Sequence, residues 1–320
     1  MRYTILLLAG LAVGVTGGPV FAQETRPFTD DLGVTSDIPV RPLRIVSMHD
    51  VSLTIPLLEL GVIPVGSHGR TTADGVPFIR SSATLTGIDF DNSEIVFIGN
   101  NPADIEAIAA VEPDLILTTT WQSIDPDLLR QVAPTLVFND SLRPGFGLYE
   151  VLADITGTTA RYEALVERYE NQIAQIRRVI DTQNISVSVL QGGNGQIFVW
   201  HTYGSLGRVL RDAGFRFPQI VDAIPEGEYA TFSAEQLQAL DADFIFSTYR
   251  TDALELPEDA LRFMNEALPN FCDFLHACRE NQYIIIPREE ASANSFYGLG
   301  QMAITVLTHV SGQRYVPMAD

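Results

Sequence analysis

The side chains best suited to binding chemistry are arginines and aromatic residues that follow predicted strands. In open α/β sheets, ligands bind beyond the carboxyl ends of the strands. Among the residues that this rule selects, the aromatic, histidine and arginine side chains are the ten candidate ligand-binding residues: His49, Arg70, Trp121, Arg143, His201, Tyr203, Tyr229, Tyr249, Arg250 and Tyr297. Aromatic rings provide contact area for a bulky organic ligand, and arginines pair with carboxylate or catecholate oxygens. For any one member of the set, a packed ring or an ordinary surface arginine is an equally good interpretation.

Trp121 is the strongest single candidate. It follows the apolar run Leu115–Thr118, in a predicted loop where a large ring is costly to expose. Arg250 takes the corresponding place after Phe244–Ser247, and Arg70 also follows a predicted strand. A ligand of about forty heavy atoms, at roughly −0.3 kcal/mol per atom, reaches about −12 kcal/mol. Nanomolar affinity is therefore attainable without covalent chemistry.

Two glutamates occupy matching positions in an internal repeat. Residues 106–119 and 235–248 align without a gap in chemical type, and each copy predicts a short helix, a tight turn and a buried strand. We expect Asn101 to cap the first helix, and Ser233 with Gln236 to form a capping box at the second. Helical spacing places Glu106 and Glu235 about 100° from the apolar stripes. Both should therefore point to solvent.

A second pair of segments recurs in the same order. Ser52–Gly61 matches Ser205–Gly214, and the predicted strands before them, Ile45–Ser47 and Phe198–Trp200, match as well. Because there are only two copies, the pattern predicts a duplicated α/β lobe rather than a solenoid. The first copy carries additional loop, which we place within Arg70–Asn92.

One long amphipathic helix is predicted between the lobes, because apolar residues recur at spacings of three and four from Leu165 to Ile180. The predicted organisation is a signal peptide at residues 1–22, an N-terminal lobe at 23–156, a connecting helix at 157–183 and a C-terminal lobe at 184–320. Residues 23–42 are polar and contain prolines, which predicts a loosely ordered segment.

Composition limits the classes of function. The chain has 320 residues and is 46% hydrophobic, which suffices for two domains of ordinary size. A net charge of −20 argues against nucleic acid and anionic membranes as partners, since both require a basic surface. Lysine is absent, which excludes a P-loop lysine, a Schiff-base lysine and a Ser-Lys dyad. The acidity itself is interpreted as an aid to solubility or a mark of a salty habitat.

The N-terminus is typical of a secretory signal. Arg2, the apolar stretch Ile5–Val15 and a small-residue cleavage site ending at Ala22 fit that pattern, with a retained membrane anchor as the alternative. No cysteine follows the apolar stretch, which argues against a lipid anchor. In an oxidising compartment we expect Cys272 and Cys278 to form a disulfide, and a pair of buried thiols is the alternative.

The order of several motifs resembles a known family. They are RIVSMHDVSLTIPLLELGVIPVG at 44–66, DIEAIAAVEPDLIL at 104–117, QVAPTLVF at 131–138, IFVWHTYGSLGRVLRDAGF at 197–215, SAEQLQALDADFIF at 233–246 and NQYIIIP at 281–287. Each is weak alone. With the long helix, their order and spacing resemble the periplasmic substrate-binding proteins of ABC importers for iron-siderophores, haem and cobalamin.

That resemblance implies two Rossmann-like lobes with parallel-rich sheets, joined by one long α-helix, with the ligand held in the cleft between them. It also implies that Glu106 and Glu235 dock into arginines of a membrane permease. The implied protein is a periplasmic monomer without an intrinsic cofactor or metal site. It would deliver an Fe(III)-siderophore complex to an ABC importer.

Three alternatives stay open. Haem or cobalamin would suit the same transporter class, and Tyr203 or Tyr249 could ligate haem. A bare metal ion would instead use histidines, although no HxH or HExxH motif is present. The histidines near the predicted cleft are His49, His68 and His201. An extracytoplasmic hydrolase would need a G-x-S-x-G motif, and the stretch around Ser205 lacks the first glycine.

Overall fold

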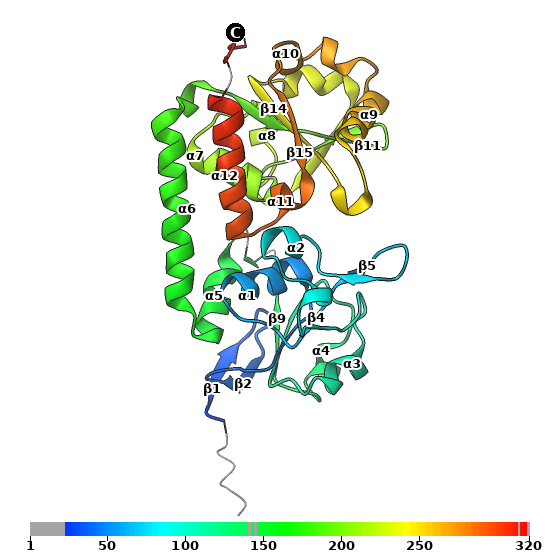
Figure 1. The fold of residues 1–320 in the computed structure, drawn as a ribbon, viewed down its shortest axis with the longest axis vertical. Helices are drawn as coiled ribbons and strands as arrows, with labels where there is room; N and C mark the ends of the chain where they lie inside the picture. Colours follow the sequence, from blue (N-terminus) through cyan, green and yellow to red (C-terminus); the bar gives the residue numbers. More distant parts are fainter. Residues whose placement is uncertain (1–22, 140–141, 144–145, 313, 319–320) are drawn as a thin grey trace, which may run out of the picture.

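The computed structural model describes residues 23–139, 142–143, 146–312 and 314–318. Two lobes are stacked along the long axis, and helix α6 (Thr159–Val179) runs beside both of them (Figure 1). This arrangement confirms the predicted α/β class and the helix-linked pair of lobes. The predicted signal peptide at residues 1–22 lies outside the described residues. Within those residues, no helix combines the length and the apolar character needed to cross a membrane.

The N-terminal lobe is built on a parallel sheet in the order β7-β4-β3-β8-β9. Its strands are β3 (Ile45–Ser47), β4 (Gly66–Ser67), β7 (Val96–Phe97), β8 (Leu115–Thr119) and β9 (Thr135–Phe138). Both β8 and β9 are buried along their whole length, as expected of parallel strands covered on two faces. The helical segments are a π-helical turn at Asp50–Thr54, α1 (Ile55–Glu59), α2 (Ser82–Leu85), a 3-10 turn at Phe90–Asn92, α3 (Ile105–Ala110), α4 (Pro126–Leu129) and α5 (Gly147–Thr156).

The C-terminal lobe contains a parallel sheet, β10-β14-β15, and an antiparallel sheet, β11-β12-β13. The strands are β10 (Val187–Val189), β11 (Gln191–Gly193), β12 (Gln196–Trp200), β13 (Tyr229–Phe232), β14 (Phe244–Tyr249) and β15 (Tyr283–Pro287). The α-helices are α7 (Gly204–Ala213), α8 (Gln219–Asp222), α9 (Pro257–Ala267), α10 (His276–Arg279), α11 (Arg288–Ser292) and α12 (Phe296–Ser311). Segments of 3-10 helix lie at Thr182–Asn184, Ala234–Leu240, Thr251–Ala253 and Phe271–Asp273.

The internal repeat holds for one pair of strands and fails for the other. Strands β8 and β14 are both buried, parallel and preceded by a short helical segment, as predicted. The predicted match between β3 and β12 is wrong, because β3 lies inside a parallel sheet and β12 pairs antiparallel with both neighbours. Asn194 and Gly195 adopt positive φ in a tight turn that reverses the chain just before β12. In the sheet, β10 pairs with β14 as β3 pairs with β8.

Two segments predicted as loops form hairpins. Residues 23–42 contain the antiparallel strands β1 (Thr25–Thr29) and β2 (Thr35–Pro39). Their connection is fixed to the lobe, because the Asp30 and Asp31 carboxylates accept hydrogen bonds from the backbone of Val137 and Asn139. The additional loop of the first lobe contains β5 (Arg70–Thr71) and β6 (Pro77–Phe78), whose hairpin projects from the lobe in Figure 1.

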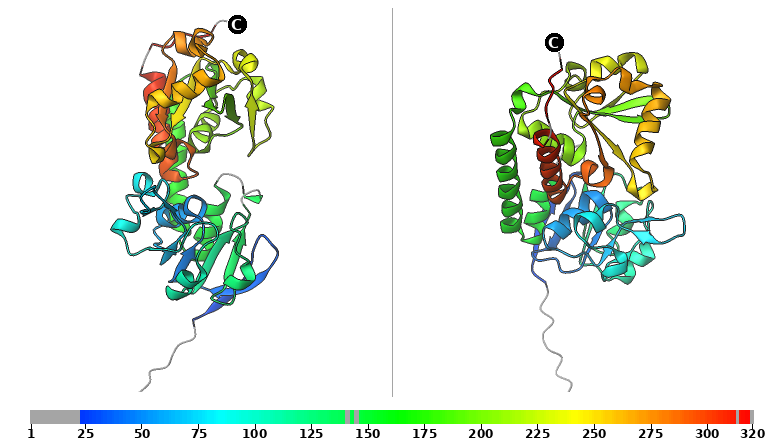
Figure 2. Two further views of the ribbon diagram at one scale, coloured as in Figure 1. Left: turned by 90° about the vertical axis from the view of Figure 1, so that its right-hand side faces the viewer. Right: turned by 45° about the horizontal axis from the view of Figure 1, so that its top comes forward.

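The lobes share one continuous apolar core. The cluster includes Leu117 of β8, Tyr149 of α5, Leu165 of α6, Phe246 of β14 and Phe296 of α12. Helix α12 packs along α6, as the turned views in Figure 2 show. The connection between the lobes is therefore a packed interface as well as a covalent link.

Glu59, the last residue of α1, joins the first lobe to the last helix. Its carboxylate is fully buried. It accepts hydrogen bonds from the backbone N–H groups of Phe296 (2.8 Å) and Tyr297 (3.1 Å), and from the hydroxyls of Tyr149 (2.7 Å) and Ser295. Burial raises the pKa of Glu59, against the lowering effect of these donors. The carboxylate thus serves as an acceptor at the N-terminus of α12.

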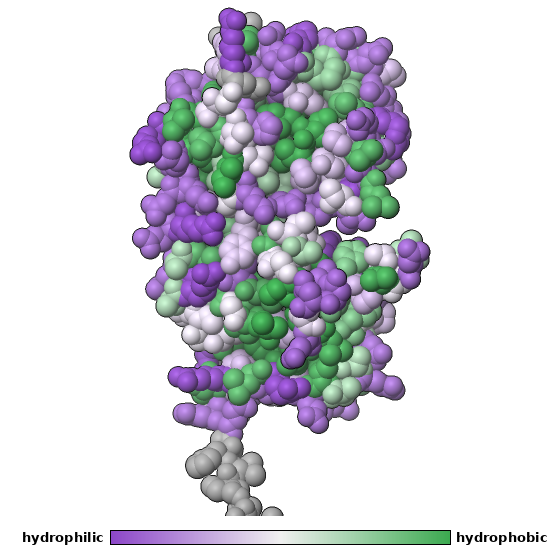
Figure 3. All heavy atoms as spheres, viewed as in Figure 1, coloured by the Kyte–Doolittle hydropathy of each residue, from purple (hydrophilic) through white to green (hydrophobic). Residues whose placement is uncertain are grey.

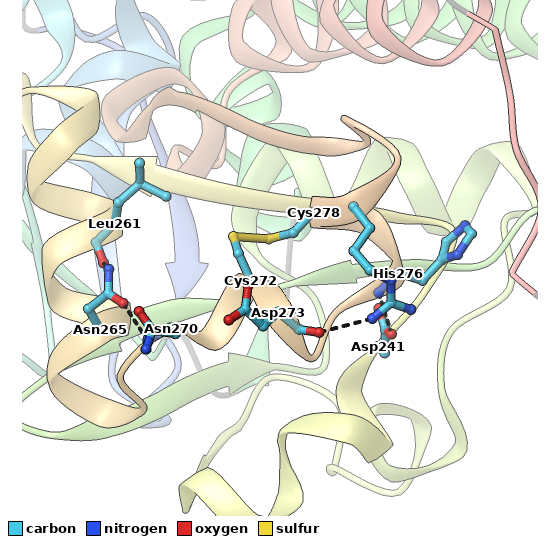
Figure 4. Close-up of a disulfide and its surroundings, with 9 residues drawn as sticks. Asp241, Leu261, Asn265, Asn270, Cys272, Asp273, His276 and Cys278 are labelled. Atoms are coloured by element: carbon cyan, nitrogen blue, oxygen red, sulfur yellow. Dashed lines mark hydrogen bonds between the residues drawn. A yellow bond between two sulfur atoms is a disulfide. The ribbon is translucent and has the colours of Figure 1, made fainter.

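The predicted disulfide is confirmed. Cys272 and Cys278, six residues apart, are bonded between a 3-10 segment and α10 (Figure 4). Side-chain hydrogen bonds hold the flanks as well: Asn265 Oδ1 accepts from Asn270 N, and Asp241 Oδ2 accepts from His276 N.

Replacing both cysteines with serine is expected to lower the free energy of unfolding by about 2 kcal/mol, because a short cross-linked loop restricts the unfolded chain only modestly. Urea denaturation of oxidised, reduced and double-serine protein measures this effect. Identical midpoints for all three would show that the flanking hydrogen bonds alone fix the loop.

Candidate functional site

The two lobes face each other across an indentation, visible at the edge of the molecule in Figure 3. Arg70 shows which residues of the first lobe face the second. It begins β5, directly after the loop that follows β4, and the charges of Asp252 and Arg250 in the C-terminal lobe act on it. The carboxyl edge of the N-terminal sheet therefore forms one wall of the cleft.

Three rings form the centre of this wall. His49, His68 and Trp121 follow β3, β4 and β8, which are neighbours in the sheet. The histidine rings are stacked with centroids 5.8 Å apart, and the indole stands edge-on to both at 5.2 Å. Trp121 is 42% exposed. The histidines thus support an indole that offers contact area to a ligand.

One ring nitrogen of His49 and both ring nitrogens of His68 form hydrogen bonds within the protein. His49 Nδ1 accepts from Ser52 N at 2.9 Å and caps the π-helical turn. His68 Nδ1 accepts from Asp50 N at 3.2 Å, which leaves Nε2–H to donate to Asn100 Oδ1 at 3.0 Å. Across the described part of the chain, no three histidine, cysteine or carboxylate side chains are grouped to hold a metal ion.

Asp50 is a fully buried carboxylate behind the rings. Arg80 donates to it at 2.9 Å. Burial opposes ionisation, but the Arg80 guanidinium holds the pKa of Asp50 well below its usual range. The Asp50–Arg80 pair is therefore an internal ion pair that positions the wall.

His49 gives the stability of the wall a pH dependence. Burial lowers the pKa of His49 from 6.5 to about 4, and the charges of His68, Arg80 and Arg70 act in the same direction. The charge of Asp50 opposes this shift. A histidine whose folded pKa is lowered stabilises the fold above its unfolded pKa, and that contribution is lost as pH falls toward the folded pKa.

We expect the parent to lose about 2 kcal/mol more unfolding free energy than His49→Asn between pH 7 and pH 5. Asparagine keeps an acceptor for the cap and does not titrate. Paired urea titrations at the two pH values give the difference. Equal losses in both proteins would show that His49 is not the titrating group.

Aromatic rings gather in the C-terminal lobe around the carboxyl end of β12, which we take as the second wall of the cleft. Trp200 ends β12 and Tyr229 begins β13, and these residues are paired across the strands with ring centroids 5.6 Å apart. Phe198 lies beside Tyr229 at 6.4 Å. Tyr229 is 58% exposed, and Trp200 is half-buried. His201 follows Trp200 in the chain, and its Nδ1 is 3.0 Å from the Thr202 hydroxyl.

The end of β14 adds a charged group to this wall. Tyr249 is half-buried and the next residue, Arg250, binds Asp252 through Nε at 3.0 Å and a second guanidinium nitrogen at 3.1 Å. Arg70 of the first lobe lies within electrostatic range of both members of this pair. The structure therefore brings arginines of both lobes together at the cleft.

Three predicted ligand-binding residues have ion-pair or hydrogen-bond partners within the protein. Arg143 forms a salt bridge with Asp31 at 2.6 Å. Tyr203 is buried in the core, with its hydroxyl 3.1 Å from that of Thr248. Tyr297 lies toward the connecting helix, where its hydroxyl accepts from Arg161 at 2.9 Å. Sequence position placed these residues after strands, but nothing in a single sequence reveals such internal partners.

Several cleft residues were missed as ligand-binding candidates. Trp200 could have been selected by the argument used for Trp121, because both are large rings at a strand end. Arg80 was not selected because it lies in the long additional loop, and Arg288, which begins α11 directly after β15, was not selected either. Asn101 does not cap α3, where Asp104 accepts from Glu106 N instead. Its amide donates to Trp121 O at 2.9 Å and so fixes the Trp121 loop.

The paired glutamates lie on exposed helical segments, as predicted. Glu106 is exposed in the first turn of α3. Glu235 is exposed in the 3-10 segment at Ala234–Leu240, where the predicted capping box of Ser233 and Gln236 is present. The hydroxyl of Ser205 is buried and donates to Ala293 O, so it is not placed as a nucleophile.

Known proteins resemble this chain in sequence and in fold. YfiY of Bacillus subtilis (strain 168), described as a probable siderophore-binding lipoprotein, is 26% identical over 265 residues, which cover 79% of this chain and 78% of YfiY. The Staphylococcus aureus SirA complex with staphyloferrin B superposes with a TM-score of 0.71 at 19% identity, covering 89% of this chain and 98% of SirA. FhuD2 from Staphylococcus aureus with bound ferrioxamine B gives a TM-score of 0.66 at 18% identity, covering 84% of this chain and 98% of FhuD2.

A family model provides the assignment. The model for periplasmic binding proteins matches residues 70–287, which is more than half of the chain and includes part of each lobe and the whole connecting helix. The structural neighbours share the same fold. This protein therefore belongs to the periplasmic binding protein family.

Proposed function

We propose that this protein captures a ferric siderophore outside the cytoplasm and delivers it to the permease of an ABC importer. The observation that carries the proposal is the cleft, where an exposed aromatic ring and at least one arginine come from each lobe. A ferric siderophore is a bulky organic complex with oxygen donors around the metal. Rings supply contact area for such a complex, and arginines bind its oxygens.

The relatives support the same class of ligand. YfiY is described as siderophore-binding, SirA has been crystallised with staphyloferrin B, and FhuD2 with ferrioxamine B. The described part of this chain offers neither a buried ring nitrogen free for haem at His68 nor a three-residue metal group. The match to the family of periplasmic binding proteins supports a role in binding and delivery rather than in catalysis.

The proposed contacts come from both walls of the cleft. In the first lobe they are His49, Arg70 and Trp121, and in the second they are Trp200, His201, Tyr229, Tyr249 and Arg250. The ligand bridges the lobes, and a small closure fixes the spacing of Glu106 and Glu235 for recognition by the permease. The protein works as a monomer, exported by the N-terminal signal.

The two tryptophans provide a direct test, because the chain has only Trp121 and Trp200, one on each wall. Fluorescence of the ligand-free protein is titrated with hydroxamate, catecholate and carboxylate ferric siderophores, haem and cobalamin. We expect saturable quenching at submicromolar concentration by one siderophore class. Trp121→Phe and Trp200→Phe should each retain part of that quenching, since the ligand touches both walls. Quenching by haem or cobalamin alone would overturn the siderophore assignment.

A further inference from the structure

Four arginines surround the cleft, and they differ in whether a carboxylate neutralises them. Arg80 pairs with Asp50 at 2.9 Å, and Arg250 pairs with Asp252 at 3.0 Å. Each of these two positive charges is therefore compensated within its own lobe. The other two are Arg70 in the first lobe and Arg288 in the second.

Arg70 has no anionic partner among the residues that the structure describes. It is half-buried, and its buried Nε makes no hydrogen bond. Burial lowers its pKa, the charges of Arg80 and Arg250 act in the same direction, and Asp50 and Asp252 oppose them. The Asp50 carboxylate already binds Arg80, and the Asp252 carboxylate already binds Arg250. Arg70 therefore has no salt-bridge partner of its own among the described residues.

Arg288 is the matching case in the second lobe. It is the first residue of α11, directly after β15, and it is half-buried. It lies beside the neutral Tyr203 hydroxyl, where its charge opposes the rise that burial causes in the pKa of Tyr203. No salt bridge to Arg288 occurs within the described ranges. The charge of Arg288 also acts on Asp252. The same carboxylate interacts electrostatically with Arg70 from across the cleft.

We propose that Arg70 and Arg288 each bind an acidic group of the ligand, so that the cleft selects a net-anionic ferric chelate over a neutral or cationic one. The inference rests on the proposed siderophore function and adds the charge class of the ligand. The shared chemistry is negatively charged oxygen, which carboxylate and catecholate chelates both supply. Because one arginine comes from each lobe, the same two contacts hold the lobes together around the ligand.

The net charge of the whole protein makes this local arrangement informative. With a net charge of −20, the protein as a whole repels an anionic ligand. Two guanidinium groups that form no salt bridge within the described residues oppose that effect where the ligand binds. A neutral hydroxamate complex would leave both of them unpaired and partly desolvated, which is unfavourable.

The test compares ligand charge in the parent protein and in charge-removing variants. Dissociation constants are measured for ferric staphyloferrin B, an anionic ferric tris-catecholate, neutral ferrichrome and cationic ferrioxamine B. The variants are Arg70→Gln, Arg288→Gln and their combination, and Arg70→Lys keeps the charge without the planar fork. Arg262→Gln is the matched control, because Arg262 is an exposed arginine of α9 that pairs with Asp259 and Glu266. Thermal melting verifies that each variant is folded.

We expect an anionic chelate to bind the parent most tightly, and each glutamine variant to weaken it about 10- to 100-fold, the loss typical of one charged hydrogen bond. Arg70→Lys should lie between the parent and Arg70→Gln, and Arg262→Gln should match the parent. Whichever of the two anionic classes binds tighter identifies the source of the acidic oxygens.

Tightest binding of ferrichrome or ferrioxamine B by the parent would overturn the charge assignment and leave the siderophore function intact. Equal loss of anionic and neutral chelates in folded glutamine variants would also overturn it, since shape rather than charge would then decide. Failure of the parent to bind any ferric chelate would overturn the proposed function itself.

Discussion

Reversing both exposed glutamates, Glu106→Arg with Glu235→Arg, is expected to reduce ferric siderophore uptake to the level of cells that lack this protein. Ligand affinity should stay within the error of the parent value, because both side chains are exposed and neither is among the proposed ligand contacts. A single surface ion pair contributes only about 0–1 kcal/mol. Like charges forced together at an interface cost several kcal/mol, so reversal has a larger effect than removal.

The measurement is uptake of radiolabelled iron as the ferric siderophore, together with a binding titration of each purified protein. Glu163→Arg with Glu258→Arg is the matched control, because it makes the same change in net charge at exposed acids of α6 and α9. Normal uptake by the Glu106 and Glu235 double variant would refute the docking role. Loss of uptake in the control would show that net charge alone is responsible.

Replacing Glu59 is expected to have the largest effect on stability. Glu59→Ala removes an acceptor from four donors in the interior, and it should lower the free energy of unfolding by about 3–5 kcal/mol. Glu59→Gln preserves shape, but each carboxylate oxygen accepts two hydrogen bonds, so an amide nitrogen would face donors. We therefore expect glutamine to be destabilising as well, by about 1–3 kcal/mol.

Urea unfolding at neutral pH measures both variants, with the exposed Glu163→Ala on α6 as the control. The Glu59→Gln protein keeps the prediction testable if the alanine variant does not fold. Parental stability in Glu59→Gln would mean that the buried carboxylate is already protonated, or that its hydrogen bonds do not tie α1 to α12. Burial raises the pKa of Glu59, so the ionised side chain is less favoured in the folded protein than in the unfolded chain. The difference in unfolding free energy between the parent and a non-titrating variant should therefore change as pH falls toward that raised pKa.

The parts of the fold that could be predicted from sequence are those with strong local patterns. The continuous apolar runs gave β8 and β14, and the spacing of three and four from Leu165 gave α6. The hairpin at residues 25–39 was missed, because its strands are short and their stability comes from contacts with β9. The place of β12 in an antiparallel sheet depends on strand pairing, which the local match to β3 cannot reveal.

Sequence position grouped several residues of one cleft wall, but it could not show which arginines have partners inside the protein. Following each strand to its carboxyl end correctly grouped His49, Arg70 and Trp121. It could not distinguish arginines that are neutralised internally from those that are not. That distinction depends on side chains brought together from distant segments, such as Asp31 beside Arg143 and Asp50 beside Arg80.

The central claim is that the protein binds an iron chelate and not iron itself. Equilibrium dialysis of the purified protein against ferric siderophore, iron-free siderophore and ferric iron without siderophore tests this directly, with iron and chelator both assayed. The account predicts that one ferric ion and one chelator are retained per chain from the complex, and that ferric iron alone is not retained. Equal retention of iron without siderophore, or no retention of any ferric complex, would contradict it.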